Sequence, residues 1–350
     1  MRKIDYDKYK DYQWDFEILR KISSISNNKG KIEVLQNQYP LVFEKMIVGS
    51  SFESIVASNT IEGIVTTDFR FKKIINEQAT PKNRSEQEIT GYKKAFKTIH
   101  ESYKYIDITP NYILQLHKIL YDQVSVQSFG GMYKNVQNYI TAFDSKGQMF
   151  TLFAPVDPFE TPGAIEMICR EYNQMLAEEH LNPLILSIIF ILDFLSIHPF
   201  NDGNGRVSRL LTILILNRLG YTVGRYVSIE HKINRSKENY YSALYASQRG
   251  WHEGTNNPLP LIDYMLSIIE LAYDELHKKI ERLTKPQSAY EMVKQSIAGK
   301  LGKITKSEVL DLCPTLSASS VEKSIHTLVK EGKLKKQGSG KNTFYIIKNI

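Results

Sequence analysis

Cysteine is scarce in this sequence, and hydrophobic runs long enough to span a membrane are missing. The 350 residues include two cysteines, Cys169 and Cys313, far apart in the chain. This pair provides neither a disulfide framework nor the spacing of a zinc site, which favours a reducing cytoplasm. The most apolar stretch, residues 184–197, is interrupted by two serines and an aspartate, so we expect a buried core helix and no membrane partner. The amino terminus is charged and aromatic and lacks the apolar segment of a signal peptide.

Arginine is absent from residues 286–350, although lysine is abundant there. This region holds eleven lysines and five acidic residues, an excess of six positive charges out of the +7 of the whole chain. A basic terminal region on a near-neutral body favours nucleic acid as a partner. A solvated lysine surface accounts for the charge equally well.

Helical periodicity dominates the rest of the chain, and no internal repeat is found. Apolar residues recur at three- and four-residue spacing in nine segments, namely residues 9–25, 41–58, 85–103, 110–120, 162–179, 184–197, 206–219, 236–248 and 260–283. Ser85 is predicted to cap its helix, and Pro110 to occupy the first position of the next one. We expect a mainly α protein with an N-terminal helical region over residues 1–84, a helical core over 85–283 and a linker from residue 284.

One segment departs from the helical pattern. Between Gly130 and Pro162, short β-branched and aromatic runs flank a turn at residues 144–147, and prolines follow. We interpret this segment as a β-hairpin and a proline-braced loop inserted in the helical body. It either borders a binding site or connects two helices without a further role.

The region beyond the linker is predicted to form three short helices followed by a glycine-turned hairpin. The helices are residues 289–298, 305–312 and 317–331, and the strands are 333–337 and 343–347. This is the order of elements in a winged helix-turn-helix domain. The residues expected to face DNA are Ser319, Ser320, Lys323, Lys335, Lys336 and Lys341. Because arginine, the commonest reader of guanine, is absent, DNA binding and protein docking through 286–350 stay equally open.

The strongest chemical signal is the segment 198–209, which reads His-Pro-Phe-Asn-Asp-Gly-Asn-Gly-Arg-Val-Ser-Arg. A glycine-rich turn before an apolar helix directs N–H groups toward one point, where phosphate is the usual occupant. Arg206 and Arg209 are three residues apart on one helix face and suit a polyphosphate. Asp202 adds a hard oxygen ligand for Mg²⁺. His198 is placed to take a proton from a hydroxyl near neutral pH.

The same twelve residues resemble the motif of the Fic (Fic/DOC) family, His-Pro-Phe-x-(Asp/Glu)-Gly-Asn-Gly-Arg-x-x-Arg, at every fixed position. Residues 86–92 resemble the family's first core helix, 131–155 its flap region, and 236–248 its adenosine-side helix. The resemblance covers about residues 40–280. It implies a Fic-domain helical bundle that transfers AMP from ATP to Ser, Thr or Tyr hydroxyls of proteins, itself included.

The resemblance also implies roles for single residues of the motif. His198 would be the general base that deprotonates the target hydroxyl. Asp202 would hold Mg²⁺ on the α- and β-phosphates. The amides of Gly203, Asn204 and Gly205 would stabilise phosphate charge, with the Asn204 side chain as a further donor.

Further roles follow for residues around the motif. Arg206 would bind the β-phosphate and Arg209 the γ-phosphate, while Tyr240 would pack near the adenosine. The sequence departs from the family pattern at two places: Gln248 stands where relatives often carry Asn, and the flap lacks the Pro-Pro pair of many members. Both departures affect the expected contacts with the nucleotide and the target, and they do not affect the expected reaction. The flap residues that would align the target as an added strand are Thr151, Leu152, Phe153 and Ala154.

Upstream, residues 58–63 read as the end of a helix closed by Gly63. A serine and a glutamate four apart on a helix are commonplace. This segment nevertheless resembles the family's inhibitory motif, Ser/Thr-x-x-x-Glu-Gly/Asn, with Ser58 and Glu62 at its fixed positions. The resemblance implies that Glu62 pairs with Arg209 and occupies the guanidinium that the γ-phosphate needs.

Other functions stay open at this point. One is a DNA-binding regulator that uses the Fic body as a nucleotide-sensing module. Another is a Fic enzyme that removes AMP or transfers a different group. A homodimer is implied by the resemblance alone, and the sequence identifies neither the target protein nor the signal that relieves inhibition.

Overall fold

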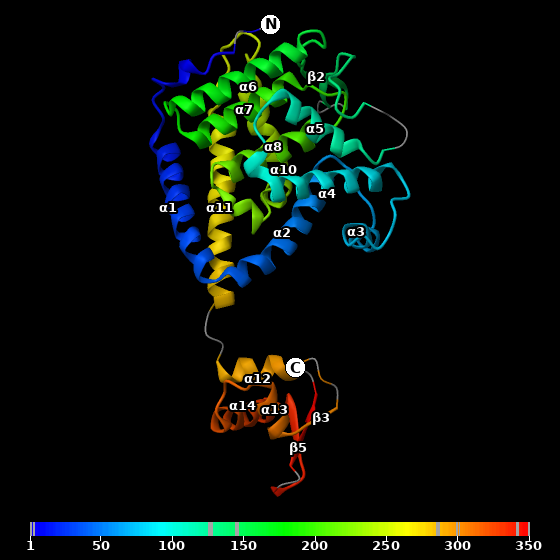
Figure 1. Cartoon of the computed structure of the whole chain (residues 1–350), viewed down its shortest axis with the longest axis vertical. Helices are drawn as coiled ribbons and strands as arrows, with labels where there is room; N and C mark the ends of the chain where they lie inside the picture. Colours follow the sequence, from blue (N-terminus) through cyan, green and yellow to red (C-terminus); the bar gives the residue numbers. More distant parts are fainter. Residues whose placement is uncertain are drawn as a thin grey trace. The chain divides into compact units, whose positions relative to one another are not determined.

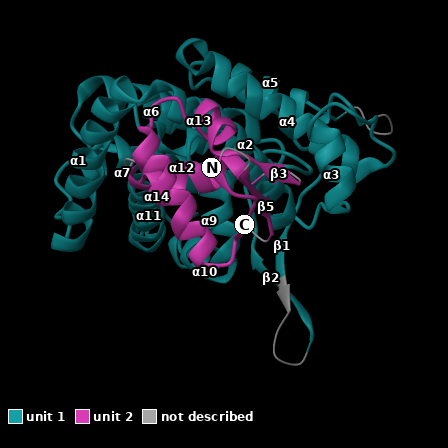
Figure 2. Ribbon diagram, turned by 90° about the horizontal axis from the view of Figure 1, so that it is seen from below, with its two compact units in different colours: residues 1–280 teal, residues 281–350 magenta. Residues whose placement is uncertain are grey.

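The computed structural model describes residues 2, 4–124, 129–143, 147–284, 288–298, 300, 302–340 and 343–348. The chain forms two compact units, Met1–Ile280 and Glu281–Ile350, which Figure 2 distinguishes by colour. The linker expected from residue 284 begins close to this division. Residues 1–84 share the first unit with the helical core, and a boundary at residue 84 stays a prediction.

Helices build most of the first unit (Figure 1). They are α1 (Phe16–Gln38), α2 (Pro40–Ile61), α3 (Asp68–Ile75), α4 (Arg84–Ser102), α5 (Pro110–Tyr121), α6 (Thr161–Glu178), α7 (Pro183–Ile197), α8 (Asn204–Arg218), α9 (Ile229–Arg235), α10 (Lys237–Gln248) and α11 (Leu259–Thr284). Between α5 and α6, the strands β1 (Ile140–Phe143) and β2 (Met149–Phe153) pair antiparallel. The expected mainly α fold with an inserted β-hairpin is therefore confirmed.

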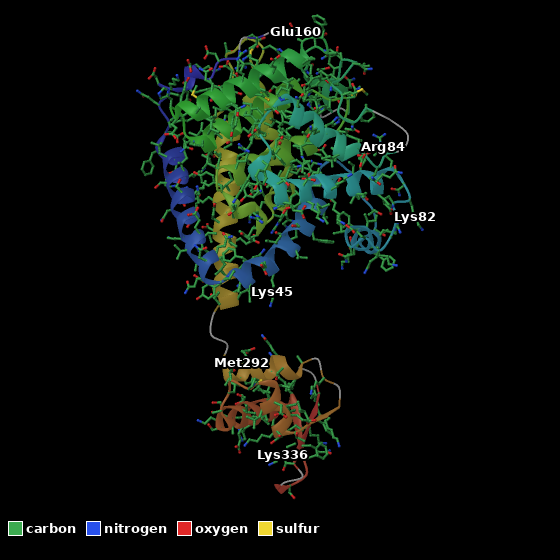
Figure 3. All side chains as sticks on the ribbon, viewed as in Figure 1. Lys45, Lys82, Arg84, Glu160, Met292 and Lys336 are labelled. Atoms are coloured by element: carbon green, nitrogen blue, oxygen red, sulfur yellow. The ribbon has the colours of Figure 1, made fainter. Side chains whose placement is uncertain are left out.

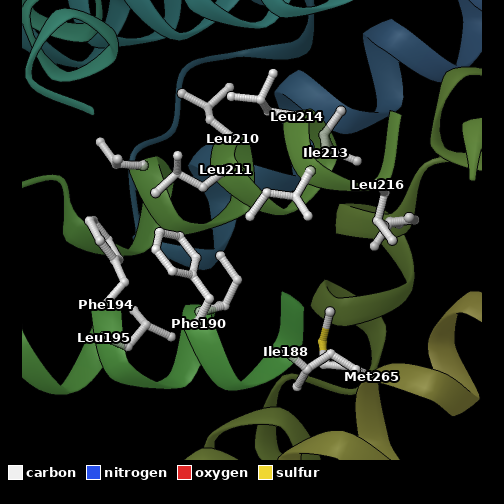
Figure 4. Close-up of a cluster of buried hydrophobic side chains, with 14 of the residues drawn as sticks. Ile188, Phe190, Phe194, Leu195, Leu210, Leu211, Ile213, Leu214, Leu216 and Met265 are labelled. Atoms are coloured by element: carbon white, nitrogen blue, oxygen red, sulfur yellow. The ribbon is translucent and has the colours of Figure 1, made fainter. Parts of the chain in front are cut away.

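Helices α7 and α8 form the centre of the first unit. Residues 184–197 of α7 are all buried, as expected for a helix that is apolar all round. Figure 4 shows the Phe190 side chain of α7 directed toward Leu211 of α8. Full burial of each such side chain contributes roughly 1.5–3 kcal/mol. This packing fixes the turn between the two helices, which carries the twelve-residue motif 198–209.

Short polar side chains start the helices, although not always the expected ones. Asn83, and not Ser85, caps α4, because the Asn83 side chain accepts a hydrogen bond from the Glu86 N–H. Ser85 already lies inside the first turn, whereas Asn83 has the extended backbone that a cap requires. Pro110 opens α5 after the cap residue Thr109, as predicted.

Other helices differ from the periodicity-based prediction. The first helix starts at Phe16, after the capping side chain of Asp15, and not at Tyr9. It continues to Gln38 because Ile32 still faces the core. Helices α3 and α9 were not predicted, since their eight and seven residues are too few for an apolar period to repeat. Within the described part of the chain, no helix combines the length and apolarity needed to cross a membrane.

The described part of the second unit contains three helices and a three-stranded antiparallel sheet around its own small core. The elements are α12 (Ala289–Ile297), β3 (Lys303–Ile304), α13 (Lys306–Leu312), α14 (Ala318–Lys330), β4 (Leu334–Gln337) and β5 (Phe344–Ile347). The predicted hairpin is β4 and β5, and the unpredicted β3 pairs with the other side of β5. Gly332 follows α14 with a φ of 74°, as its predicted C′ position requires. Lys341 and residues 144–146 lie outside the described residues.

Candidate active site

The twelve-residue motif forms the turn that links α7 to α8. His198 ends α7 with a left-handed φ of 52°, and Gly203 leads into α8 with a φ of 85°. A Cβ at position 203 would lie 2.9 Å from the hydroxyl oxygen of Tyr121, so glycine is needed there. The Asn204 amide accepts from the Phe200 N–H at 2.9 Å and donates to the Phe200 carbonyl oxygen at 2.7 Å. The Asn204 side chain therefore braces the turn, and its donation to phosphate stays a prediction.

A buried histidine on α5, His117, holds the middle of this turn. Its Nδ1 accepts from the Gly131 N–H at 3.0 Å, so its Nε2 carries the proton and donates to the Asp202 carbonyl oxygen at 3.1 Å. The ring stacks on Phe200 with centroids 3.7 Å apart. Burial lowers the pKa of His117 to about 4, so the ring is neutral at pH 7. His117 thus ties α5 and the loop before the hairpin to the motif.

The His198 side chain is prepared to accept a proton. Burial lowers its pKa to about 4, so the imidazole is neutral at pH 7. Its Nδ1 lies 3.3 Å from the Leu195 carbonyl oxygen, which can only accept a hydrogen bond. The proton therefore lies on Nδ1, and Nε2 keeps its lone pair, to which no group of the described residues donates.

Arg209 is held by the end of α2. Its Nε donates to the Ser58 hydroxyl at 2.8 Å, and its Nη2 donates to the Ser58 carbonyl oxygen at 2.9 Å. The same Nη2 pairs with the Glu62 carboxylate at 2.8 Å. Glu62 follows the last residue of α2, and Gly63 closes the helix with a φ of 74°, as predicted. The structure therefore brings the predicted residues Ser58, Glu62 and Arg209 together.

Gly205 makes room for this ion pair. A Cβ at position 205 would overlap Oε1 of Glu62, so only glycine lets the carboxylate lie against the first turn of α8. Lys237 adds a further bond, because its Nζ donates to the Ile61 carbonyl oxygen at 2.6 Å. The end of α2 is thus bound to both α8 and α10.

Arg206 faces the interior of the protein. Its side chain is 1% exposed, and its Nη1 pairs with Glu88 of α4 at 2.7 Å. Its Nη2 donates to the Tyr121 hydroxyl at 2.7 Å. In this arrangement Arg206 anchors α8 to α4 and α5, and its contact with a β-phosphate stays a prediction that requires it to leave Glu88.

Asp202 lies at the mouth of the site with its side chain about half exposed (47%). One carboxylate oxygen accepts from the Gly203 N–H at 2.7 Å. The other pairs at 3.0 Å with Arg84, which Figure 3 labels near the start of α4. Among the described residues no group of three or more His, Cys, Asp or Glu side chains could hold a metal ion. A lone carboxylate still fits Mg²⁺, because phosphate oxygens and water supply its other ligands.

A cleft of about 230 Å³ is lined by His198, Asp202, Arg209 and Glu62 together. Its polar end is formed by Glu62, Arg209 and the turn from His198 to Gly205. The rest of its lining is largely aromatic and aliphatic, consisting of Ile140, Leu152, Leu195, Tyr240, Tyr241, Leu244, Tyr245 and Gln248. The predicted adenosine-side residues Tyr240 and Gln248 are thus in the same cleft as His198, and the Gln248 amide donates to the Ser196 hydroxyl at 3.2 Å.

The hairpin borders this cleft. Leu152 of β2 lines it, whereas Thr151 is exposed. Phe153 stacks on His252 with centroids 5.5 Å apart, and His252 donates to the Ala154 carbonyl oxygen at 2.7 Å. Since β1 and β2 form a two-stranded sheet, β2 has a free edge in the described structure.

Sequence reasoning missed several side chains that hold the site. His117 occupies the buried face of a predicted helix, where a single histidine is usually an ordinary core residue. Glu88 lies in the segment 86–92, which resembles the family's first core helix, but the sequence predicts no role for Glu88 itself. Tyr121 and Arg84 could not be assigned to the site from local sequence, because the motif residues that they contact, Arg206 and Asp202, are more than 80 residues away in the chain.

Comparisons with solved structures support the fold. The chain resembles a Fic family protein from Desulfovibrio desulfuricans G20 with a TM-score of 0.67 and 17% identity over 97% of this chain and 98% of the other. It resembles a fragment of Fic-1 from C. elegans with a TM-score of 0.60 and 18% identity over 76% of this chain and 74% of the other. The helical body therefore has the architecture of Fic proteins.

Sequence comparisons identify the domain. Residues 107–216 match the model of the Fic/DOC family, so the chain contains a Fic/DOC domain. Protein adenylyltransferase Fic of Drosophila sechellia is 31% identical over 206 residues, which are 57% of this chain and 38% of that protein. The corresponding protein of Drosophila yakuba is 30% identical over 177 residues, 49% of this chain and 33% of the relative. The match thus spans less than two-fifths of either relative.

Proposed function

We propose that this chain is a protein adenylyltransferase that is inhibited by its own Glu62. The observation that carries the proposal is the single cleft that joins a neutral His198, the glycine turn at the start of α8, and an Arg209 paired with Glu62. The relatives named protein adenylyltransferases support the same activity.

The reaction follows from the placement of these groups. The oxygen of a Ser, Thr or Tyr hydroxyl attacks the α-phosphorus of ATP, and Nε2 of His198 takes its proton. The bond from the α-phosphorus to the bridging oxygen breaks, and pyrophosphate leaves with that electron pair. The backbone N–H groups at the start of α8 face the phosphates and stabilise the developing charge. The aromatic lining along α10 accommodates the base, and the free edge of β2 accommodates the target as an added strand.

Mg²⁺ is the expected cofactor. Asp202 would hold it, and Arg84 would have to release one carboxylate oxygen for this purpose. When bound, Mg²⁺ would neutralise charge on the phosphates of the nucleotide.

Inhibition follows from competition for one guanidinium. Arg209 is 3% exposed and makes its described hydrogen bonds to Ser58 and Glu62. A γ-phosphate that reaches Arg209 must displace the Glu62 carboxylate, which occupies the same end of the cleft. ATP is then misaligned or excluded until the end of α2 moves.

The test is transfer of label from α-labelled ATP to protein by the full chain. Replacing Glu62→Gly is expected to raise incorporation at least tenfold, including self-modification, because the competing carboxylate is gone. His198→Ala in the Glu62→Gly background is expected to abolish incorporation without loss of folding. Equal incorporation by the wild type and Glu62→Gly would refute the inhibition. The same assay with other nucleotides, and with AMP-modified protein, tests transfer of a different group and removal of AMP.

A second function is favoured by the basic C-terminal unit. Its helices and hairpin follow the order of a winged helix-turn-helix, and Ser319, Lys323, Lys335 and Lys336 are exposed. Ser320 is partly buried, with its hydroxyl 2.9 Å from that of Ser317. Binding to duplex DNA would make the chain a regulator whose Fic domain senses nucleotide. His198→Ala separates the two roles, because it should stop transfer and leave DNA binding unchanged.

A further inference from the structure

Lys134 is a buried lysine that the proposed reaction does not use. It lies in the loop between α5 and β1 and is 3% exposed. A buried ammonium group is costly unless hydrogen bonds replace its water. Here Nζ donates to the Ile197 carbonyl oxygen at 3.1 Å and to Oδ1 of Asn138 at 3.0 Å. The group is therefore satisfied, and one of its partners is the residue immediately before His198.

The contacts of Lys134 and Asn138 bracket His198. The Lys134 backbone N–H donates to the Pro199 carbonyl oxygen at 2.8 Å, on the other side of the histidine. Asn138 donates through Nδ2 to the Phe200 carbonyl oxygen at 3.0 Å. Three carbonyl groups around His198 are thus held by one short segment of the loop.

Such a clamp is needed because His198 has a left-handed backbone with a φ of 52°. A non-glycine residue adopts this conformation only where its surroundings impose it. The Lys134 side chain fixes the Ile197 carbonyl group before His198, and the Lys134 backbone N–H fixes the Pro199 carbonyl group after it. The side chain of Lys134 therefore contributes to holding the imidazole in its direction into the cleft.

The charge of Lys134 also acts on His198. Burial is the main cause of the low pKa of His198, and the positive charge of Lys134 lowers it further, whereas the negative charges of Glu62 and Asp202 raise it. Burial lowers the pKa of Lys134 itself to about 8, so it is still mostly protonated at pH 7. Both effects keep His198 in the neutral form that accepts a proton.

We infer that Lys134 is a positioning residue for His198: its side chain holds the left-handed turn through the Ile197 carbonyl group, next to the Pro199 carbonyl group that its backbone N–H holds. The role in turnover rests on the proposed function, whereas the effect on His198 does not. Lys134 is not part of the cleft lining, so nucleotide affinity should be independent of it.

The test compares Lys134→Met and Lys134→Arg in the full-length Glu62→Gly protein. Methionine keeps the apolar stem and removes the charge and the donor, whereas arginine retains both. Lys29→Met is the matched control, because Lys29 also donates to a carbonyl group at a helix end, that of Leu219 at 3.0 Å, away from the cleft. Melting temperatures identify any variant that is merely unstable, and Asn138→Ala provides a milder disruption of the same clamp.

The first readout is the pKa of His198 from NMR titration of the histidine rings, with His198→Ala for assignment. Lys134→Met should raise it by about one pH unit, Lys134→Arg should leave it near the parental value, and Lys29→Met should not change it. An unchanged pKa in a folded Lys134→Met protein overturns the predicted effect of the Lys134 side chain on His198.

The second readout is turnover. Lys134→Met should lower kcat for AMP transfer roughly ten- to a hundredfold with the ATP dissociation constant changed less than about twofold, and Lys134→Arg should restore most of kcat. Parental kcat in Lys134→Met, or an equal loss in Lys134→Met and Lys29→Met, overturns the positioning role. If the Glu62→Gly parent transfers no AMP, the proposed function fails, and the His198 titration still tests whether the Lys134 side chain acts on His198.

Discussion

At the scale of the residue, Gly205 has a purpose that the sequence does not show. The glycine-rich motif suggested a free turn, but the left-handed backbone belongs to Gly203, and Gly205 lies inside α8. Gly205 instead leaves the space that Oε1 of Glu62 occupies beside Arg209. The need for this space disappears when the glutamate is removed.

The effect of Gly205→Ala on the free energy of unfolding is therefore expected to have opposite signs in the wild type and in the Glu62→Gly protein. In the wild type the new methyl group displaces the Glu62 carboxylate from Arg209 and costs about 1–2 kcal/mol of the free energy of unfolding. In the Glu62→Gly protein the overlap with Glu62 is gone, and the remaining close neighbour is Nη1 of Arg209 at 3.3 Å, the end of a side chain that can shift by a few tenths of an ångström. Alanine in the helix should then be neutral or stabilising by up to about 1 kcal/mol. Urea unfolding of the four proteins measures the coupling. Equal changes in both backgrounds would show that Glu62 does not occupy this space in solution.

At the scale of the element, α2 is attached to the body by a row of polar groups four residues apart. The Ser50 hydroxyl donates to the Arg225 carbonyl oxygen, and the Ser54 hydroxyl donates to that of Ser228 at 2.9 Å. Ser58 follows with its bond from Arg209, and Glu62 ends the row. Residues at this spacing share one helix face. The end of α2 that we propose to be inhibitory is therefore the last part of a hydrogen-bonded face.

Ser58→Ala and Ser50→Ala form a matched pair for this face. Each removes one hydroxyl and should lower the free energy of unfolding by about 1 kcal/mol. Ser58→Ala should also raise AMP transfer, although less than Glu62→Gly, because Arg209 keeps its bonds to the Ser58 carbonyl oxygen and to Glu62. Ser50→Ala should not raise transfer, because its partner is the Arg225 carbonyl group. Labelled-ATP assays and urea unfolding of both variants provide the measurement, and an equal rise in transfer would assign the effect to general loosening of α2.

At the scale of the whole molecule, the excess of positive charge and the candidate active site belong to different compact units. The cleft lies in the first unit, whereas six of the net positive charges lie in residues 286–350. The second unit has its own hydrophobic core, so its surface can be tested separately.

The fragment 286–350 is expected to be retained on duplex DNA at low salt, and the fragment 1–285 is not. The logarithm of its affinity should fall by about 0.9 per phosphate contact for each tenfold increase in salt. Replacing Lys335 and Lys336 with glutamine should reduce the slope of this salt dependence by the amount that about two phosphate contacts contribute. Salt titrations monitored by fluorescence anisotropy provide the slopes. Absence of retention at low salt would exclude the DNA role and leave protein docking.

Much of the fold could be predicted because its signals are local. Apolar periodicity located α2, α4 to α8, α10 and α11, and β-branched runs located the hairpin. The short α3 and α9 could not be found in this way. Their positions depend on contacts such as the pairing of Arg70 on α3 with the buried Glu86 on α4, which are not encoded in the spacing of nearby residues.

The sequence by itself determined the chemical groups of the site, because His198, Asp202, the glycine turn and Arg209 lie within twelve residues of one turn and helix. Only the tertiary structure decided how they are held. Glu62 meets Arg209 across 147 residues, and Lys134 meets the peptide groups around His198 from another loop. Such contacts arise when burial of the helical core brings distant segments together, and burial also makes His198 a neutral acceptor. No local pattern of residues records either effect.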